Sequence, residues 1–430
     1  MTAWTNWGLS AEANPIQVEH PASTTDVVAI VRKAAAAGHK VKAIGAGHSF
    51  TAIGATDGVL VHLDRMKNVL GWDMEVGRVR VQAGISLHDL NLILKGHGLA
   101  FPNLGDIDPQ SVAGAVSTGT HGTGGKLHGI SKTVVGVQLV TAAGEVLEID
   151  EDHELFGASR VTLGALGILT EVTLQCVPAF LLHAREEPMA LHEVFDCLDE
   201  LIEDNDHFEF YWFPHTEKAL VKRNNRVAAG SVAEPIGRFK HWLDDEFLSN
   251  EAFDVVNKVA RQTPRLIPRI NNVSATLLSA RDYVDDSFKV FVSPRRVKFR
   301  ESEFAVPRYA LQDVLGELRT WLDGGHEFIT FPIEVRFTAA DDVWMSTGHE
   351  RDNAYVAVHQ YYKTDYRSYF AAAESIFTEH EGRPHWGKLH TLGADYFRKR
   401  YEHFDDFVEA RNQLDPGRLF TNPYLERVLG

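Results

Sequence analysis

The chain has only two cysteines in 430 residues, Cys176 and Cys197, and each lies within an apolar or helical pattern. A disulfide framework and a cysteine-based metal site are therefore not expected. No segment approaches the roughly eighteen consecutive apolar residues that a transmembrane helix needs. Residues 1–7 also lack the basic region and the apolar core of a signal peptide. Together these absences predict a cytoplasmic protein without a transmembrane segment.

Basic residues are also fewer than acidic ones. The chain has 43 lysines and arginines and 59 aspartates and glutamates, which gives a net charge of −16 at pH 7. Proteins that bind nucleic acid need a basic face for the phosphates, so no nucleic-acid partner is expected. The same balance disfavours an anionic membrane surface, and it is typical of charge that keeps a protein in solution. With 44% hydrophobic and 24% charged residues, the composition predicts a globular protein of two domains or one large one.

The most informative segment is residues 45–49, Gly-Ala-Gly-His-Ser, which follows the strand-like run 41–44. Two glycines two positions apart leave backbone N–H groups free to face a phosphate. A Rossmann turn would continue with a third glycine that opens a helix, whereas here His48 and Ser49 follow. This pattern predicts a different nucleotide-binding turn, with His48 as a candidate nucleophile toward an electrophilic cofactor. The alternative is an ordinary glycine-rich turn with a hydrogen-bonded histidine.

Two further segments contain the same kinds of residue. Residues 109–124 alternate small and hydroxyl side chains without any charge, and residues 162–169 are apolar and interrupted by glycine. Such segments pack poorly as a core and well against a flat, polar ligand. Three of them before residue 170 indicate one extended cofactor that lies across several loops.

Local patterns predict a mixed α and β first half without the βαβ alternation of a doubly wound sheet. One predicted helix covers 26–35, capped by Thr25 and ended by Gly38, and another runs from the cap Ser86 to residue 94. Strand patterns cover 41–44, 58–63, 78–83 and a hairpin of 134–139 with 145–149. After residue 178 we expect a second domain with a helix over 191–202, strands at 208–213, 290–292, 327–337 and 355–361, a surface excursion over 223–244, and mostly helix from residue 366.

The chain resembles the vanillyl-alcohol-oxidase-type flavoproteins, and within them the aldonolactone and alditol oxidase branch. The residues that carry this resemblance are 45–50, 117–122 and 163–167 in the first half, and 334–336, 383–388 and 420–422 in the second. The resemblance implies an α+β protein with an FAD-binding domain of two subdomains over 1–178. It also implies a substrate-binding cap domain over 179–375 and a C-terminal segment, 376–430, that returns to the flavin.

By the same resemblance FAD is the cofactor, attached covalently through His48 to the 8α-methyl group of the flavin. A flavin held without a covalent bond beside His48 is the alternative. His121 is expected to contact the flavin or to orient the backbone, and not to act as a base. The expected cofactor-binding residues are Gly45, Ala46, Gly47, His48, Ser49, Phe50, Ser111, Gly114, Ser117, Thr118, Gly119, His121, Gly122, Gly167, Ile168, His385 and Lys388.

Glu334 and Arg336 are two positions apart on a strand-like run, so both side chains emerge on one face. That spacing alone is typical of a structural salt bridge. The resemblance places the pair in the substrate pocket, where Arg336 would stabilise charge on the oxygen of the oxidised carbon and Glu334 would position Arg336 or bind a hydroxyl. It places Lys388 beside the flavin as a cation that stabilises the reduced ring. His359 matches another catalytic pocket position, with a buried structural histidine as the alternative.

Two neighbouring residues bear on the reaction. In the family the residue at the position of Gly105 controls access of oxygen to the flavin, and a small residue permits it. Asp106 stands where the alditol oxidases carry serine, which favours a substrate-binding role on a sugar 1,4-lactone. The resemblance therefore implies oxidation of a gulono-, galactono- or arabinono-lactone, with O₂ or another electron acceptor.

Three other interpretations remain at this stage. An alditol oxidase would act on a primary hydroxyl of a polyol such as xylitol or sorbitol. A metal hydrolase is suggested only by the 21 histidines, since His385 and His390 are five apart and no His-Glu-x-x-His motif occurs, so no metal is expected. A protein that only binds a ligand would not explain the presence of Glu334, Arg336 and Lys388.

Overall fold

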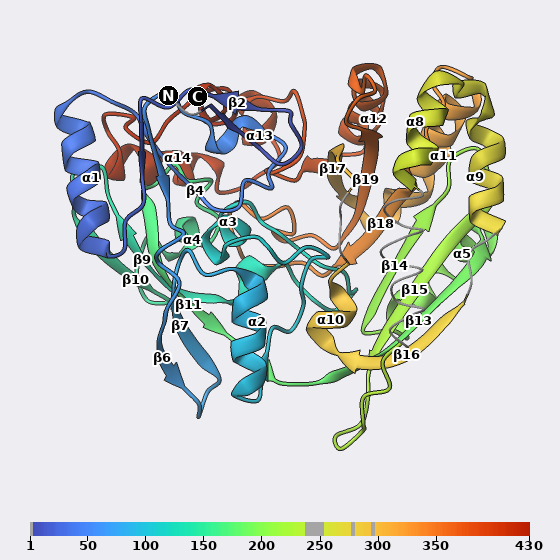
Figure 1. The fold of residues 1–430 in the computed structure, drawn as a ribbon, viewed down its shortest axis with the longest axis horizontal. Coiled ribbons are helices and arrows are strands. Elements are labelled where there is room, and N and C mark those ends of the chain that lie inside the picture. Colours follow the sequence, from blue (N-terminus) through green and yellow to red (C-terminus); the bar gives the residue numbers. More distant parts are fainter. Residues whose placement is uncertain (1–2, 237–252, 277–279, 294–296) are drawn as a thin grey trace.

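The computed structural model of the chain describes residues 3–236, 253–276, 280–293 and 297–430. The first half contains two main sheets (Figure 1). In the three-stranded sheet, β5 (Val59–His62) pairs in parallel with β3 (Gln17–Glu19) and β4 (Val41–Ile44). The second sheet is antiparallel, in the order β10 (Val146–Asp150), β9 (Val134–Val140), β11 (Ile168–Gln175), β7 (Arg78–Gln82) and β6 (Val69–Asp73). The predicted strands and the 134–149 hairpin are thereby confirmed.

Short helices connect these strands, namely α1 (Thr24–Ala36), α2 (Leu87–Gly96), α3 (Val112–Ser117) and α4 (Phe156–Ser159). The prediction that Ser86 caps α2 is confirmed, because its side chain accepts from the N–H of Asp89. The predicted cap of α1 is wrong: Ser23, and not Thr25, accepts from the N–H of Asp26, and the helix begins two residues earlier. Both residues are good N-caps, and only Ser23 has the extended backbone that a cap requires.

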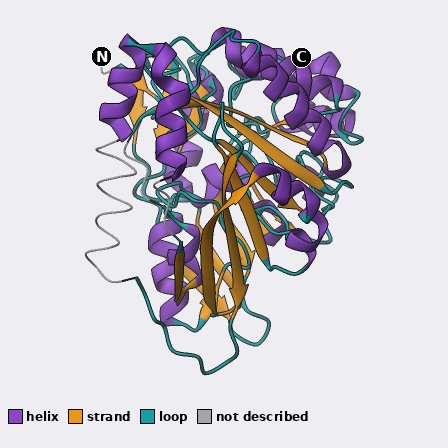
Figure 2. Ribbon diagram, turned by 90° about the vertical axis from the view of Figure 1, so that its right-hand side faces the viewer, coloured by secondary structure: helices purple, strands orange, loops and turns teal. Residues whose placement is uncertain are grey.

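The second half is built on one eight-stranded antiparallel sheet. Figure 2 shows its long strands side by side, with helices packed beside them. The strand order is β16 (Arg281–Asp286), β13 (Leu181–Ala190), β15 (Lys218–Arg226), β14 (His207–Trp212), β18 (Ile333–Thr338), β19 (Asn353–Tyr361), β17 (Phe299–Pro307) and β20 (Arg383–Pro384).

Alternation along these strands separates an apolar face from a polar one, since successive side chains point to opposite faces. On β18, Val335 and Phe337 belong to the apolar core, whereas Glu334 and Arg336 face the other way into a cavity. The apolar face is covered by α5 (Leu191–Asp196), α6 (Leu198–Glu203), α11 (Leu311–Asp323) and α12 (Arg367–Glu379). Residues of the polar face line the cavity.

Several predictions for the second half need correction. The helix over 191–202 is two helices, because the backbone leaves helical geometry at Cys197. Residues 290–292 are not a strand: α10 (Ser287–Phe291) occupies most of this run, with Lys289 paired to Asp285 and Asp286 at helical spacing. The strand predicted from 327 begins only at Ile333. The excursion over 223–244 starts within β15, residues 228–235 are exposed, and 237–244 lie outside the described residues.

The C-terminal segment packs on the first half of the chain. After β20 it is largely helical, as predicted, with α13 (Ala394–Arg398), α14 (Phe404–Leu414) and α15 (Pro423–Leu429). Figure 1 shows this red segment beside the blue strands of the N-terminal part. Trp386, Phe397, Phe404 and Leu425 belong to the same apolar cluster as the strands of the first half. The side-chain amide of Asn422 donates to the carbonyls of residues 52, 53 and 55.

The remaining described helices are α8 (Phe253–Gln262) and α9 (Ile267–Thr276), which lie at the outer edge of the large sheet (Figure 1). Among the described residues, no helix has both the length and the apolar character needed to cross a bilayer.

Candidate functional site

Two adjoining cavities lie where the halves of the chain meet. The larger has a volume of about 930 Å³ and is lined by the polar face of the large sheet and by loops of the first half. The smaller, about 120 Å³, runs along the glycine-rich loops 42–49, 110–118 and 162–169. Both are lined by His48, Ser49, Gln110 and Thr118, so they form one continuous site. This shape suits a long ligand with a compact part in the groove and a flat part in the cavity.

The smaller cavity, here called the groove, offers free backbone donors. Within the described part of the chain, the N–H groups of residues 46–49 donate to no acceptor. Gly47 adopts a φ of 69°, which turns consecutive N–H groups toward one side as in anion-binding nests. Gly45 is required for close packing, because a Cβ there would lie 2.0 Å from the Ser111 hydroxyl oxygen. Ser111 in turn caps α3 by accepting from the N–H of Gly114 at 3.2 Å.

His48 lies at the junction of the two cavities. Its ring stacks on Trp7 with 5.7 Å between the centroids. Burial, together with the positive charge of Lys388, lowers the pKa of His48 below its usual value. The imidazole is therefore neutral at pH 7 and keeps a nitrogen lone pair, which a nucleophile needs.

Arg336 is the centre of a buried charge cluster on one wall of the larger cavity. Its Nε donates to Glu209 at 2.9 Å, one terminal nitrogen contacts Glu334, and Asp106 lies 3.4 Å away. Tyr211 donates to Glu209 or Glu334, each at 3.2 Å. Burial opposes the charged form of Arg336, but the carboxylates of Glu334, Asp106 and Glu209 raise its pKa well above the usual value. Arg336 is thus a fixed cation held by three carboxylates.

A second charge cluster joins Lys388 to His359 through Glu301. The Lys388 ammonium lies 2.5 Å from one carboxylate oxygen of Glu301, and the His359 Nε2 lies 3.5 Å from the other. Burial alone would raise the pKa of Glu301, yet Lys388 and His359 lower it to about 2. Burial would also lower the pKa of Lys388, and Glu301 and Glu303 raise it instead. Both side chains are therefore charged at neutral pH.

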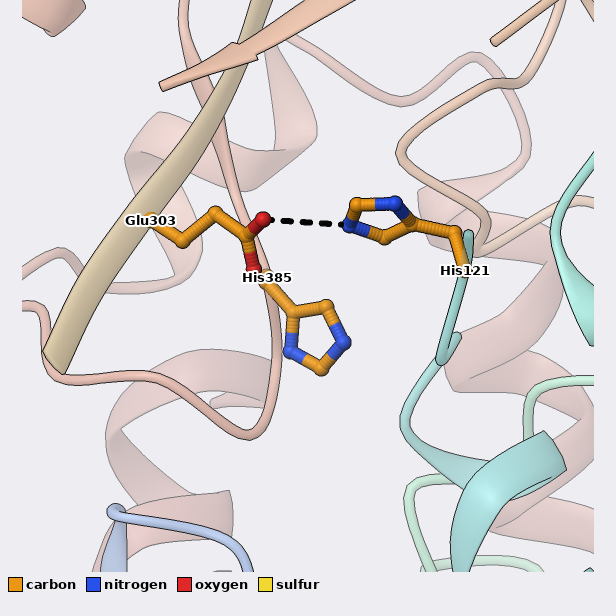
Figure 3. Close-up of side chains that lie close together, drawn as sticks. All are labelled: His121, Glu303 and His385. Atoms are coloured by element: carbon orange, nitrogen blue, oxygen red, sulfur yellow. Dashed lines mark ion pairs between the residues drawn. The ribbon is translucent and has the colours of Figure 1, made fainter. Parts of the chain in front are cut away.

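His121, Glu303 and His385 form a third group in the same wall (Figure 3). His121 Nε2 lies 3.3 Å from Glu303, and the ligand-type atoms of the three residues lie within 4.8 Å of one another. Such a set suggests a metal site, but His385 does not fit. Its Nδ1 accepts from the N–H of Gly387 at 3.0 Å, so its Nε2 carries the proton in the neutral ring. Burial lowers the pKa of His385 to about 3, which keeps the ring neutral.

Most of the residues expected at the site line one of the two cavities. The larger is lined by Phe50, Gly105, Asp106, His121, Glu334, Arg336, His359, His385 and Lys388, and the groove by Gly45, Ala46, Gly47, Ser111, Gly114, Ser117, Gly167 and Ile168. Gly119 and Gly122 line neither. A Cβ on Gly122 would lie 2.2 Å from the carbonyl oxygen of Leu104, so this glycine permits close backbone packing.

Several polar residues of the charge clusters were not predicted. Tyr211, Lys222, Glu301 and Glu303 line the larger cavity, and the buried Glu209 binds Arg336 and Lys222. Glu301 and Glu303 are two positions apart on a strand, the same spacing that drew attention to Glu334 and Arg336. That spacing is the feature of the sequence from which Glu301 and Glu303 could have been predicted. Glu209 gave no comparable signal, because its partner Arg336 lies on another strand.

Comparison with known proteins assigns the two halves. The sequence profile of an FAD binding domain matches residues 15–150, and that of the D-arabinono-1,4-lactone oxidase family matches residues 172–428. The chain is 39% identical to the L-gulono-1,4-lactone dehydrogenase of Mycobacterium tuberculosis over 99% of both proteins. It is 36% identical to the L-gulonolactone oxidase of Bos taurus over 98% of this chain and 97% of that protein. Identity to the alditol oxidase of a Streptomyces species is 28%, over 100% and 99%.

Among solved structures, the cholesterol oxidase of Brevibacterium sterolicum superposes with a TM-score of 0.84. The match covers 100% of this chain and 96% of that one at 18% identity, and so it shows the shared fold alone. The family is shown by the sequence matches, which run through both halves and through the loops that line the cavities. The chain therefore belongs to the D-arabinono-1,4-lactone oxidase family of FAD-dependent oxidoreductases.

Proposed function

We propose that this chain oxidises a sugar 1,4-lactone of the gulono-, galactono- or arabinono- type at the carbinol carbon next to the lactone carbonyl. The observation that carries the proposal is the fixed guanidinium of Arg336, which lines the same cavity as the Lys388 cluster. This cavity adjoins the cofactor groove at His48. The activities in the names of the relatives support the same substrate class.

The groove fits the phosphate-bearing part of FAD, because the N–H groups of 46–49 are free donors and the positive φ of Gly47 turns them toward one side. The larger cavity fits the flavin ring. When bound, FAD supplies the acceptor for the hydride that leaves the carbinol carbon. We propose that His48 carries a covalent bond to the flavin, supported by its place at the junction and its neutral ring.

Within this proposal the charged side chains have separate tasks. Arg336 binds the oxygen of the carbon that is oxidised and stabilises the charge that develops there. Glu334 and Asp106 hold the guanidinium and accept from substrate hydroxyls. Lys388 stabilises negative charge on the reduced cofactor, and His359 lines the same pocket. Gly105 leaves room for O₂.

The remaining parts of the proposal concern organisation and partners. We propose a cofactor domain over 1–178, a substrate domain over 179–375 and a segment, 376–430, that completes the site. O₂ or another electron acceptor takes the electrons, and no nucleic acid takes part. Cys176 and Cys197 are free thiols, which supports action in a reducing compartment such as the cytoplasm.

A substrate panel tests the proposal directly. Under anaerobic conditions, L-gulono-, L-galactono- and D-arabinono-1,4-lactone are mixed with the enzyme, and loss of flavin absorbance is followed by stopped flow. At least one lactone is expected to bleach the flavin about tenfold faster than xylitol or sorbitol at equal concentration. Faster bleaching by a polyol would instead assign an alditol oxidase. No bleaching by either class would reject both substrates.

Gly45→Ala is expected to lower the flavin content of the purified protein at least tenfold. The new methyl group would overlap the Ser111 hydroxyl and displace the start of α3, which lines the groove. Absorbance ratios of flavin to protein measure the effect. The control is Gly316→Ala, at an exposed position of α11 where a Cβ meets nothing within 4 Å and flavin content is expected to be unchanged. Full flavin content in Gly45→Ala would show that the groove does not hold the cofactor.

A further inference from the structure

The charge cluster of Arg336 is one end of a row of charged side chains that crosses five of the eight strands of the large sheet. The five residues lie directly opposite one another in register, and their charges alternate. Because residues paired across neighbouring strands point to the same face, the whole row lies on the polar face. From the edge strand β16 inward, its members are Arg281, Glu186, Lys222, Glu209 and Arg336.

Ion pairs connect the members of this row. Arg281 lies 3.7 Å from Glu186. Lys222 lies 3.3 Å from one carboxylate oxygen of Glu209, and Arg336 donates to the other oxygen at 2.9 Å. Even the most exposed of the five side chains, that of Lys222, is only 19% exposed. The row is therefore a buried, ordered wall and not a set of solvated surface charges.

Lys222 is a charged donor in the wall of the larger cavity. Burial opposes its charged form, but Tyr211, Glu186 and Glu209 raise its pKa well above the usual value. Its ammonium has three N–H donors. Within the described part of the chain, Glu209 is the only carboxylate within 4 Å of it, and another side of the ammonium lies over the Tyr211 ring, 5.0 Å from the centroid. A donor is thus left for a ligand in the cavity.

The charges of this wall favour a neutral ligand with hydroxyl groups. Glu334 and Asp106 also contact Arg336, so the ion pairs of the row contain three cations and four carboxylates. Such a wall has no excess of positive charge for a phosphate or a carboxylate. A hydroxyl group both donates and accepts hydrogen bonds, and alternating cations and carboxylates offer partners for both.

The position of Lys222 relative to Arg336 suits the length of one sugar. Only β14 separates β15, which carries Lys222, from β18, which carries Arg336. At the usual strand spacing the two backbones are about 10 Å apart. If Arg336 binds the oxygen at the oxidised carbon, the opposite end of the sugar can reach Lys222. In a six-carbon 1,4-lactone, that end is the hydroxyl group of the sixth carbon.

We propose that Lys222 is a specificity-determining residue, which donates a hydrogen bond to the terminal hydroxyl group of a six-carbon substrate. The inference rests on the proposed function, since it adds a second contact to the substrate whose oxidised carbon lies at Arg336. Its consequence is selection by chain length, because a shorter sugar leaves the Lys222 donor without its partner.

A matched pair of substrates tests this contact in the wild-type holoenzyme. The pair is the six-carbon lactone that reduces the flavin faster, L-gulono- or L-galactono-1,4-lactone, and its 6-deoxy analogue, which lacks one oxygen. Anaerobic stopped flow gives the rate of flavin reduction divided by the dissociation constant of each sugar. The ratio of the two values is expected to be at least about tenfold in favour of the parent lactone, as for loss of one hydrogen bond to a charged group.

Variants assign this ratio to a residue. In Lys222→Met the ratio is expected to fall to within about threefold of one, because the donor is gone. Lys222→Gln, which keeps the length of the side chain and loses its charge, is the second variant, and its ratio is expected to fall at least threefold. Flavin content and Tm show whether each variant is folded. The control is Lys289→Met: Lys289 also lines the cavity, but it is 49% exposed and paired with Asp285 and Asp286, so the wild-type ratio is expected.

Three results would overturn the proposal. A wild-type ratio near one would show that nothing binds the terminal hydroxyl group. An unchanged ratio in the Lys222 variants would assign that group to another residue or show that Lys222 acts only through Glu209. A ratio that is also lost in Lys289→Met would make it a general property of the cavity.

These outcomes are separate from a failure of the proposed function. If no lactone bleaches the flavin, the proposed function is wrong, and the same ratio is measured with sorbitol and its terminal deoxy analogue. If six-carbon lactones bleach the flavin but show no dependence on the terminal hydroxyl group, only the role of Lys222 is wrong. Reduction by the five-carbon lactone alone would also reject that role.

Discussion

Arg336→Lys is expected to slow flavin reduction by the lactone about 10²- to 10³-fold, the range found when one preorganised donor to a developing oxyanion is lost. Lysine keeps the positive charge among Glu209, Glu334 and Asp106 but not the planar fork that contacts them together. Anaerobic stopped-flow absorbance measures the rate, and the flavin content is expected to stay at the wild-type value.

The choice of lysine separates catalysis from folding. Arg336→Ala would remove the cation that Glu209, Glu334 and Asp106 share, and breaking a buried pair costs about 3–5 kcal/mol. Glu334→Gln is the companion variant, because it keeps the shape of the side chain while weakening its hold on the guanidinium. It is expected to slow reduction at least tenfold with FAD intact. Reduction rates within about threefold of the wild type in both variants would remove the pair from the reaction.

His48→Ala is expected to abolish covalent attachment of the flavin altogether. After acid precipitation the wild-type pellet remains yellow, whereas the flavin of the variant stays in the supernatant. The reason is that His48, the proposed point of attachment, has a neutral ring at the junction of groove and cavity. Fluorescence of the band on a denaturing gel gives an independent measurement.

The control for this variant is His88→Ala, since His88 also lines the larger cavity but is more than half exposed and paired with Asp108. Its pellet is expected to stay yellow. A colourless wild-type pellet would show that the flavin is held without a covalent bond, and the groove alone would then account for its retention.

The sequence correctly predicted those helices and hairpins whose formation depends on residues close together in the chain. The cap at Ser86 and the hairpin of 134–149 were found because a helix start and a tight turn each depend on a few adjacent residues. The run 290–292 misled because three consecutive apolar residues fit a strand and a helix equally well, and the pairing of Lys289 with Asp285 and Asp286 favours the helix.

The charge clusters depend on strand register, which the sequence does not display. Glu209 on β14 lies opposite Arg336 on β18, and Glu301 on β17 lies opposite His359 on β19. Each pairing joins residues from strands that are not consecutive in the chain. A single carboxylate on an apolar run looks like an ordinary exposed residue until its neighbour across the sheet is known. Arg336, Lys388, Glu334 and Asp106 were predicted from the family resemblance, whereas Glu209 and Glu301, which also bind the two cations, were not.

The packing of the last residues onto the first strands has a consequence for biosynthesis. Lys42 at the floor of the groove donates to the carbonyls of Gly164 and Phe420, and Asn422 closes the loop 52–55. Residues 420 and 422 are translated long after the groove loops, so the nascent first half emerges with this part of its core incomplete. Stable loading of the cofactor is then expected only after these residues have been made.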